Sequence, residues 1–175
     1  MRLAQLRVKS GDEALLRAEI AAAKSLCAAA GAQLIVNDYW RLAIDLGCAF
    51  VHLGQEDLDS ADVSAIRRAG LRLGVSTHDE RELDRALSVD PDYVALGPVF
   101  PTTTKQTKLR EQGLEPVKRW RKALGARPLV AIGGIRLERA ADILAAGADS
   151  LALVSDVLNA PDPEARARQW VMATR

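Results

Sequence analysis

Short apolar runs alternate with longer amphipathic segments along the whole chain. Apolar runs of about four to eight residues are typical of buried strands, whereas apolar residues spaced three or four apart are typical of helices. The pattern predicts strands at Leu3–Val8, Gln33–Val36, Phe50–Leu53, Leu71–Val75, Tyr93–Leu96, Leu129–Ile132 and Ser150–Val154. It predicts helices at Asp12–Ala30, Tyr39–Leu46, Ala61–Ala69, Asp79–Ser88, Glu115–Leu124, Leu137–Ala146 and Asp162–Ala173. A strand followed by a helix, repeated along the chain, indicates a parallel sheet.

The predicted helix ends coincide with glycines, which readily take the left-handed conformation that closes a helix. Gly47, Gly70 and Gly147 each lie between an apolar helical run and the next strand, which indicates one repeated βα unit. No linker or low-complexity stretch interrupts the series, so we expect a single barrel-type domain over residues 1–175. The longest irregular stretch, Pro98–Gly113, is expected to be a mobile loop with functional potential.

Two parallel α/β architectures compete for this pattern. Polar residues capable of chemistry follow nearly every predicted strand, and the carboxyl ends of the strands are where barrel active sites lie. In a doubly wound open sheet, the alternative, such residues should gather at one switch point. The distribution favours a TIM (β/α)8-type barrel of which seven βα units are visible in this chain.

The charge balance argues against some classes of function. Lys and Arg number 24 and Asp and Glu 23, so the formal net charge is 24 − 23 = +1. This argues against a partner that is a nucleic acid or a membrane, because proteins that neutralise many phosphates carry a clear basic excess. Cys27 and Cys48 lie in apolar surroundings without metal-ligand spacing, as small buried hydrophobes do. No apolar stretch is long enough for a membrane span and no signal peptide is visible, so we expect a cytoplasmic protein.

Candidate site residues follow the first three predicted strands. Gln5, Arg7 and Lys9 alternate and therefore point to one face, which would be either a barrel interior or the wet face of an edge strand. Asp38 and Asp57 follow adjacent strands and would form a hard-cation site, for which Mg²⁺ fits best. The competing interpretation of Asp38 is a helix N-cap. His52, within a strand, is assigned no catalytic role.

The later strands carry hydroxyls, one further histidine and glycines. Ser76 and Thr77 precede a predicted helix, where one hydroxyl would act as a cap, and no nucleophile is suitably spaced from His78. The run Thr102–Lys105 offers hydroxyls and an ammonium group that suit phosphate or pyrophosphate. Gly133 and Gly134, with Ser155 after the last strand, predict a backbone anion site, although these glycines could simply turn the chain.

Eight stretches in this order resemble the thiamine-phosphate synthase family, which belongs to a superfamily shared with a thiazole tautomerase. They are Gln5–Lys9, Val36–Asp38, Val51–Leu58, Gly74–His78, Gly97–Lys105, Gln112–Glu115, Val130–Ile135 and Leu153–Ser155. The resemblance implies a transferase that joins hydroxymethylpyrimidine diphosphate to hydroxyethylthiazole phosphate and releases pyrophosphate. It implies a dissociative mechanism, in which the diphosphate leaves before the thiazole nitrogen attacks.

The resemblance also implies roles for single residues. Asp38 and Asp57 would hold Mg²⁺, while Gln5 would help to seat the pyrimidine. The diphosphate would be bound by Arg7, Lys9, Asn37, Ser76 and Lys105. The thiazole phosphate would be bound by Thr102, Thr104, Gly134, Val154 and Ser155. The partners are thus small-molecule substrates.

One difference from the tautomerase and one departure from the synthase family bear on this interpretation. The tautomerase tends to have histidine at the positions of Asn37 and Pro98, so this chain is closer to the synthase; a catalytically inactive homologue that binds thiazole phosphate or thiamine phosphate is the alternative. Family members usually have about 30 residues, a strand and a helix, before the Gln5–Lys9 stretch. Their absence would mean a truncated chain, a barrel with a gap, or a homo-oligomer in which another chain fills the gap.

Overall fold

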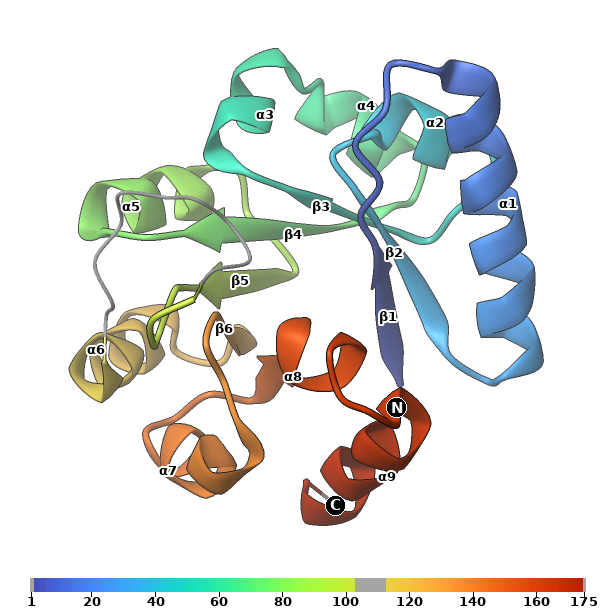
Figure 1. Cartoon of the computed structure of the whole chain (residues 1–175). Helices are drawn as coiled ribbons and strands as arrows, with labels where there is room; N and C mark the ends of the chain where they lie inside the picture. The colour runs from blue at the N-terminus through green and yellow to red at the C-terminus, as the bar shows by residue number, and fades with distance from the viewer. Residues whose placement is uncertain (1, 103–112, 175) are drawn as a thin grey trace. The chain divides into compact units, whose positions relative to one another are not determined.

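The computed structural model describes residues 2–102 and 113–174 of the chain. Its strands are β1 (Leu3–Leu6), β2 (Gln33–Asn37), β3 (Phe50–Leu53), β4 (Arg72–Thr77), β5 (Tyr93–Leu96), β6 (Leu129–Ile132) and β7 (Ser150–Ala152). Its helices are α1 (Glu13–Ala29), α2 (Trp40–Asp45), α3 (Gln55–Ser60), α4 (Val63–Arg68), α5 (Glu80–Ser88), α6 (Leu114–Leu124), the 3-10 turn η1 (Leu137–Arg139), α7 (Ala140–Ala145), α8 (Ser155–Leu158) and α9 (Pro163–Ala173) (Figure 1).

The predicted α/β class is confirmed, with a strand in each of the predicted places and strand order β1 to β7 as in the chain. The strand predicted at Leu3–Val8 is shorter, because β1 ends at Leu6. Two helices, α3 and α8, were not predicted. Helix α3 is polar except for the buried Leu58, and α8 has only four residues, so neither shows an amphipathic period. Among the described helices, none combines the length and apolar character that a membrane crossing requires.

The contacts divide the chain into two compact units, which we describe separately. Unit 1 comprises Met1–Val75 and Leu87–Asp92, and unit 2 comprises Ser76–Ala86 and Tyr93–Arg175. In unit 1, β1, β2, β3 and the start of β4 pair in parallel, with Val36 opposite Val51 and Phe50 opposite Arg72. All four residues of β3 are buried, including His52, and the other three side chains are apolar.

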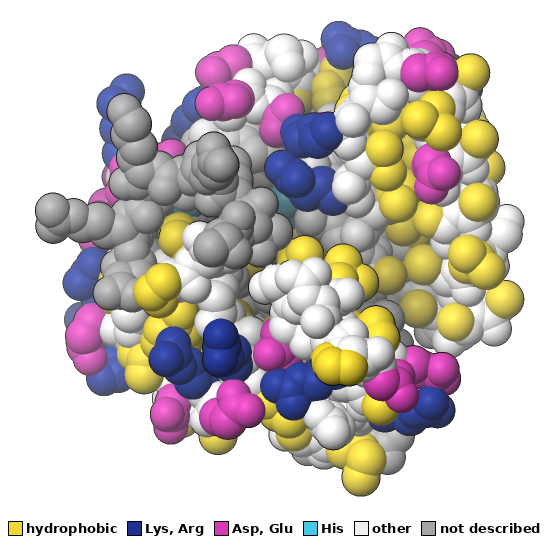
Figure 2. All heavy atoms as spheres, viewed as in Figure 1, with side chains coloured by type: hydrophobic (Ala, Val, Ile, Leu, Met, Phe, Trp, Pro, Cys, Tyr) yellow, Lys and Arg dark blue, Asp and Glu magenta, His cyan; other side chains and the backbone are white. Residues whose placement is uncertain are grey.

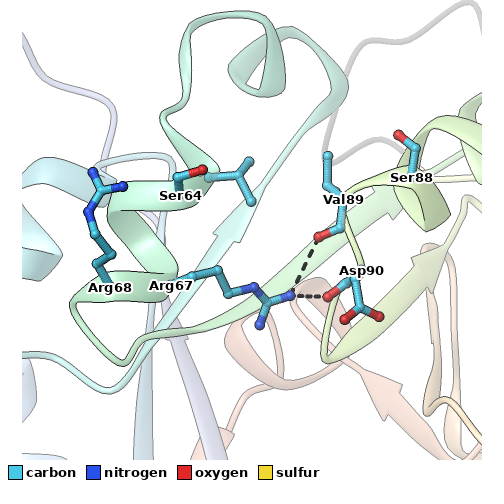
Figure 3. Close-up of a pocket in the computed structure, with 7 residues that line it drawn as sticks. Ser64, Arg67, Arg68, Ser88, Val89 and Asp90 are labelled. Carbon is cyan, nitrogen blue, oxygen red and sulfur yellow. Dashed lines mark hydrogen bonds between the residues drawn. The ribbon is translucent and has the colours of Figure 1, made fainter.

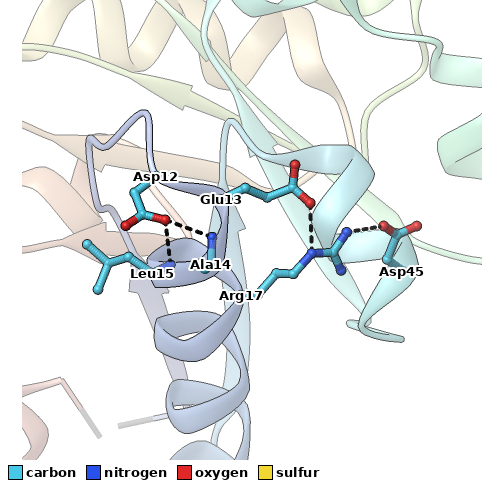
Figure 4. Close-up of polar contacts among 6 residues, drawn as sticks. All are labelled: Asp12, Glu13, Ala14, Leu15, Arg17 and Asp45. Carbon is cyan, nitrogen blue, oxygen red and sulfur yellow. Dashed lines mark hydrogen bonds and ion pairs between the residues drawn. The ribbon is translucent and has the colours of Figure 1, made fainter.

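Polar contacts cap α1 and join its first turns to α2. Asp12 accepts hydrogen bonds from the amides of Ala14 (2.9 Å) and Leu15 (3.1 Å), which caps the helix. Arg17 pairs with Glu13 and with Asp45 of α2, both at 2.8 Å (Figure 4). The helix buries only two residues, so hydrophobic side chains remain on its outer surface, as Figure 2 shows at the right of the view.

In unit 2, β5, β6 and β7 pair in parallel, with Val94 opposite Leu129 and Val130 opposite Ser150. A chain of buried hydrogen bonds lies in the core of unit 2. The Thr77 hydroxyl donates to the carbonyl of Ala95 at 3.0 Å and accepts from the Trp120 indole at 2.9 Å. Because Thr77 is fully buried, these bonds replace those it would make to water.

One contact set occurs in both units and supports the predicted repeat of a βα unit. In unit 1, Asp92 accepts from the amide of Leu73 at 2.7 Å and pairs with Arg67 at 3.0 Å, while its own amide donates to Leu73 at 2.7 Å. The corresponding residues in unit 2 are Asp149, Leu129 and Arg121. In unit 1 the aspartate joins the start of β4 to α4, and in unit 2 it joins the start of β6 to α6.

Candidate active site

Asp38 and Asp57 lie together at the carboxyl ends of β2 and β3 in unit 1. Asp57 is on the first turn of α3, where its carboxylate accepts the amide hydrogen of Gly54 at 3.0 Å. The pKa of Asp57 is raised, first by burial, then by the negative charge of Asp38 and by a hydrogen bond between the two carboxyl groups. The structure thus brings together the two carboxylates that the sequence placed on adjacent strands.

The backbone of Asp38 has an unusual conformation for a residue that is not glycine. Its φ is 66°, in the left-handed region. The amide of Tyr39 donates to the carbonyl of Asn37 at 2.9 Å, and the amide of Trp40 donates to the carbonyl of Asp38 at 2.8 Å, so two tight turns follow each other. Asp38 does not cap α2, whose N-cap residue is Tyr39, so the capping interpretation is wrong. Strain of this kind is typical of functional sites.

The Asp38 side chain, which is 13% exposed, forms an ion pair with Lys9. Gln5, Arg7 and Lys9 are exposed and alternate with less exposed residues, as expected if they share a face. Arg7 and Lys9 lie beyond the end of β1, in the segment that leads to α1. Their exposure agrees with the wet-face interpretation of this strand.

Asn37 and His52 are paired neighbours on β2 and β3, and both are buried. Burial lowers the pKa of His52 to about 4, although the charge of Asp38 acts in the opposite direction. A neutral imidazole therefore lies beside the carboxylate pair at neutral pH. It adds no positive charge to the site.

The carboxylate pair fits a magnesium ion. A divalent cation would relieve the repulsion that raises the pKa of Asp57. No group of three or more His, Cys, Asp or Glu suited to a metal occurs among residues 2–102 and 113–174. Mg²⁺ suits such a sparse set, because it is often bound by one or two carboxylates, substrate phosphates and water.

The candidates of unit 2 at the end of β4 are Ser76, which is half-buried, and His78. The Nδ1 atom of His78 lies 2.6 Å from Glu82, which also accepts the His78 amide at 2.7 Å. The side chain of Asp79 accepts the Glu82 amide at 2.8 Å, within the first turn of α5. Thr77 does not cap this helix, because its hydroxyl belongs to the buried chain with Trp120.

Gly133 and Gly134, after β6, pack against the segment that follows β5. Both have positive φ, 94° and 62°, and the amide of Phe100 donates to Gly133 at 3.1 Å. A Cβ atom on Gly134 would lie 2.6 Å from the carbonyl oxygen of Phe100. Turn geometry and close packing therefore explain both glycines without a ligand, and the anion site stays a prediction.

The remaining predicted residues of unit 2 are near chain turns. Val154 follows β7 and is 42% exposed, and the half-buried Ser155 begins α8. Thr102 is half-buried in the segment after β5. Thr104 and Lys105, like most of the predicted mobile loop, lie outside the described residues.

A hydrogen-bond network around Asp156, the residue after Ser155, was not predicted from the sequence. Asp156 accepts hydrogen bonds from Arg166 (2.9 Å) and from the indole of Trp170 (2.7 Å). Burial alone would raise the pKa of Asp156, but these two donors and the charges of Arg166 and Arg136 hold it below its usual value. The four-residue spacing of Arg166 and Trp170 places them on one face of α9, which was the available signal.

Unit 1 also contains a pocket of about 550 Å³. It is lined by α4 and by the segment after α5, which precede the amino ends of β4 and β5 (Figure 3). Arg67 in its wall is held by the carbonyls of Val89 and Asp90 and by Asp92. The guanidinium group is therefore engaged in holding the fold. The pocket lies near the amino end of β4, whereas Asp38 and Asp57 follow the carboxyl ends of β2 and β3.

Parallel strands in chain order, with carboxylates and cations near their carboxyl ends, are typical of barrel-type α/β enzymes, whose active sites lie at that end of the strands. The sequence model of the thiamine monophosphate synthase family matches residues 1–157, and the chain belongs to this family.

Individual relatives agree with this assignment. The thiamine-phosphate synthase of Rhizobium etli is 61% identical over 99% of this chain and 85% of its own length. That of Neisseria meningitidis serogroup B is 53% identical over 92% of this chain and 78% of its own length. Among solved structures, a thiamine phosphate pyrophosphorylase from Pyrococcus furiosus has a TM-score of 0.86 and 26% identity, covering 98% of this chain and 82% of the other. A 3-hexulose-6-phosphate synthase from Salmonella typhimurium, 18% identical with a TM-score of 0.73 over 99% of this chain and 86% of its own, shares the fold.

Proposed function

We propose that the chain is a thiamine-phosphate synthase that joins hydroxymethylpyrimidine diphosphate to hydroxyethylthiazole phosphate. The products are thiamine phosphate and pyrophosphate. The observation that carries the proposal is the juxtaposition of Asp38, Asp57 and Lys9, two carboxylates and a cation at strand carboxyl ends. Family membership and the relatives named thiamine-phosphate synthase support it.

The residues of unit 1 are proposed to bind the pyrimidine diphosphate. Arg7 and Lys9 are exposed cations on one face and would contact the diphosphate oxygens. Gln5, on the same face, would help to seat the pyrimidine, and the Asn37 amide would donate to the diphosphate. Asp38 and Asp57 would hold Mg²⁺, which supplies positive charge to the leaving diphosphate when bound.

Residues of unit 2 are proposed to supply further ligands for the two substrates. Ser76 and Lys105 would bind the diphosphate. The thiazole phosphate would be bound by Thr102, Thr104, Gly134, Val154 and Ser155. The network of Asp156 with Arg166 and Trp170 supports this assignment, since it fixes the residue next to Ser155.

The chemistry proposed for these residues is dissociative. The bond between the pyrimidine methylene carbon and the diphosphate oxygen breaks, and its electron pair leaves with the diphosphate. The lone pair of the thiazole nitrogen then forms the new bond to the methylene carbon. This reaction asks the protein for charge stabilisation and positioning rather than a strong base, so Arg7, Lys9 and Lys105 are proposed as the catalytic residues.

The other proposed activities of the fold are less well supported. Proton transfer in the thiazole tautomerase depends on a histidine, but Pro98 stands at that position and His52 is buried with a lowered pKa. An inactive homologue that only binds thiazole phosphate or thiamine phosphate would have no need for the Asp38–Asp57 pair, whose repulsion costs stability.

We also propose that the sheet is part of a complete (β/α)8 barrel. A further strand and helix beside β1 would complete a (β/α)8 barrel, supplied by the same chain or by another copy in a homo-oligomer. The exposed Leu3 on β1 supports such a neighbour. Light scattering of the purified chain, with and without an added upstream segment, would distinguish these arrangements. We further expect the enzyme to act in the cytoplasm.

The test is to incubate the purified chain with both substrates and to identify the product by mass spectrometry. The proposal predicts thiamine phosphate only when both substrates and Mg²⁺ are present. A folded sample that binds thiazole phosphate but forms no product would favour the inactive homologue. Product formed equally well in the presence of excess chelator would contradict the metal assignment.

A further inference from the structure

Tyr39 connects the two segments that carry Lys9 and Asp38. Its hydroxyl group donates a hydrogen bond to the carbonyl oxygen of Ser10 at 3.1 Å and accepts one from the amide of Ser10 at 3.3 Å. Lys9 precedes Ser10, and Asp38 precedes Tyr39, so the Lys9–Asp38 ion pair and the Ser10–Tyr39 contact are adjacent. Both pairs join residues that are 29 positions apart in the chain.

The two hydrogen bonds fix backbone rather than side chain. A single hydroxyl satisfies both polar groups of Ser10, which restricts the peptide units on either side of this residue. The Ser10 side chain then accepts the amide of Asp12 at 3.0 Å, and Asp12 caps α1. The segment after Lys9 is therefore held at two successive points.

Tyr39 is itself held rigidly relative to Asp38. Its φ of −79° and ψ of 62° belong to the second of the two tight turns. The next residue, Trp40, is 8% exposed and anchors the start of α2 in the core of unit 1. The position of the tyrosine hydroxyl is thus determined by the same turns that give Asp38 its conformation.

The Lys9 side chain needs such support. It is 58% exposed, and a lysine in water has a flexible four-carbon stem whose ordering costs conformational entropy. Fixing the backbone from which the stem departs lowers the number of positions open to the ammonium group. A charge that is already in place binds an anion better than one that must be ordered on binding.

We propose that Tyr39 is a positioning residue that holds Lys9 beside Asp38 for recognition of a diphosphate. This inference rests on the proposed function, because it uses Lys9 as a diphosphate ligand. Tyr39 acts through the Ser10 backbone and does not itself touch the substrate.

The test compares Tyr39→Phe with Tyr93→Phe. The second variant removes the hydroxyl of the only other tyrosine, which is buried in β5 of unit 2. For Tyr39→Phe we expect about a tenfold rise in the KM for the pyrimidine diphosphate and in the Kd for inorganic pyrophosphate with Mg²⁺. The KM for the thiazole phosphate should stay within about twofold, and Tyr93→Phe should change neither KM. A merely structural role would instead lower the melting temperature and change both KM values together, and that result would overturn the proposal.

A double-mutant cycle identifies Lys9 as the group through which Tyr39 acts. In a Lys9→Met background, Tyr39→Phe should weaken pyrophosphate binding no further, since the positioned ammonium is gone. A full additional tenfold loss would show that Tyr39 acts by another route, and the inference would be wrong. If the wild-type chain forms no thiamine phosphate but the pyrophosphate cycle behaves as expected, the proposed function fails while the inference stands. Unchanged pyrophosphate binding in Tyr39→Phe, with an active wild-type enzyme, would overturn the inference alone.

Discussion

Replacing Asp57 with asparagine should make the protein more stable and less active. The side chain keeps its size, and the amide oxygen can still accept the Gly54 amide hydrogen, so the first turn of α3 keeps its contact. What disappears is a negative charge that is partly buried beside Asp38. Opposite effects on stability and on activity are therefore expected from one substitution.

The sign of the stability change follows from the raised pKa of Asp57. Because the folded state favours the protonated carboxyl, the charged form weakens folding as the pH rises above the ordinary value of 3.8. At neutral pH, Asp57→Asn removes this cost. We expect a gain of about 1 kcal/mol, typical of a functional site that is relieved of strain, and a rise in melting temperature of about 3 °C.

The sign of the activity change follows from the proposed metal site. With one carboxylate left, the site should bind Mg²⁺ and the diphosphate poorly, and kcat/KM should fall about 100-fold or more. Thermal unfolding followed by circular dichroism and a coupled pyrophosphate assay measure the two effects. Asp59→Asn, an exposed position on the same helix, is the matched control and should change neither. A less stable Asp57→Asn variant with normal turnover would refute the reasoning.

Three further predictions concern unit 2. Gly134→Ala should lower the free energy of unfolding by about 1 kcal/mol or more, because φ is 62° and the new Cβ would meet the carbonyl of Phe100. Chemical denaturation measures this free energy. Asp149→Asn should lower stability by about 1–3 kcal/mol by weakening a contact that joins two strand starts, and a melting temperature equal to that of the wild type would contradict it. Because the pKa of Asp156 is lowered, its bonds to Arg166 stabilise the fold above about pH 4; that contribution should disappear as the pH falls through the lowered pKa, whereas Asp156→Asn should lack this acid-sensitive part.

The order of elements and the placement of the carboxylates could be predicted from the sequence. Strands such as β5 are buried on both faces, so they appear as uninterrupted apolar runs. Asp38 and Asp57 follow the largely apolar strands β2 and β3, and parallel strands in register bring their carboxyl ends together. Helix α8 was missed because its four residues are too few to show a period.

Contacts between distant segments could not be predicted in the same way. The hydrogen bond of Tyr39 to Ser10 depends on two successive turns with an unusual backbone. The sequence around Asp38 does not predict that its φ is 66°. The packing role of Gly134 depends on Phe100, which lies on another loop. Local patterns predict elements and their ends, whereas such contacts arise only when the strands have paired.

The most direct test of the proposed reaction measures thiamine phosphate and pyrophosphate in the same sample as both substrates are consumed. A synthase releases one pyrophosphate for each thiamine phosphate formed, so the two amounts should rise together and only with Mg²⁺ present. Pyrophosphate released without thiamine phosphate would show hydrolysis of the pyrimidine diphosphate instead. That result would contradict the account of Asp38, Asp57 and Lys9 as the core of a synthase site.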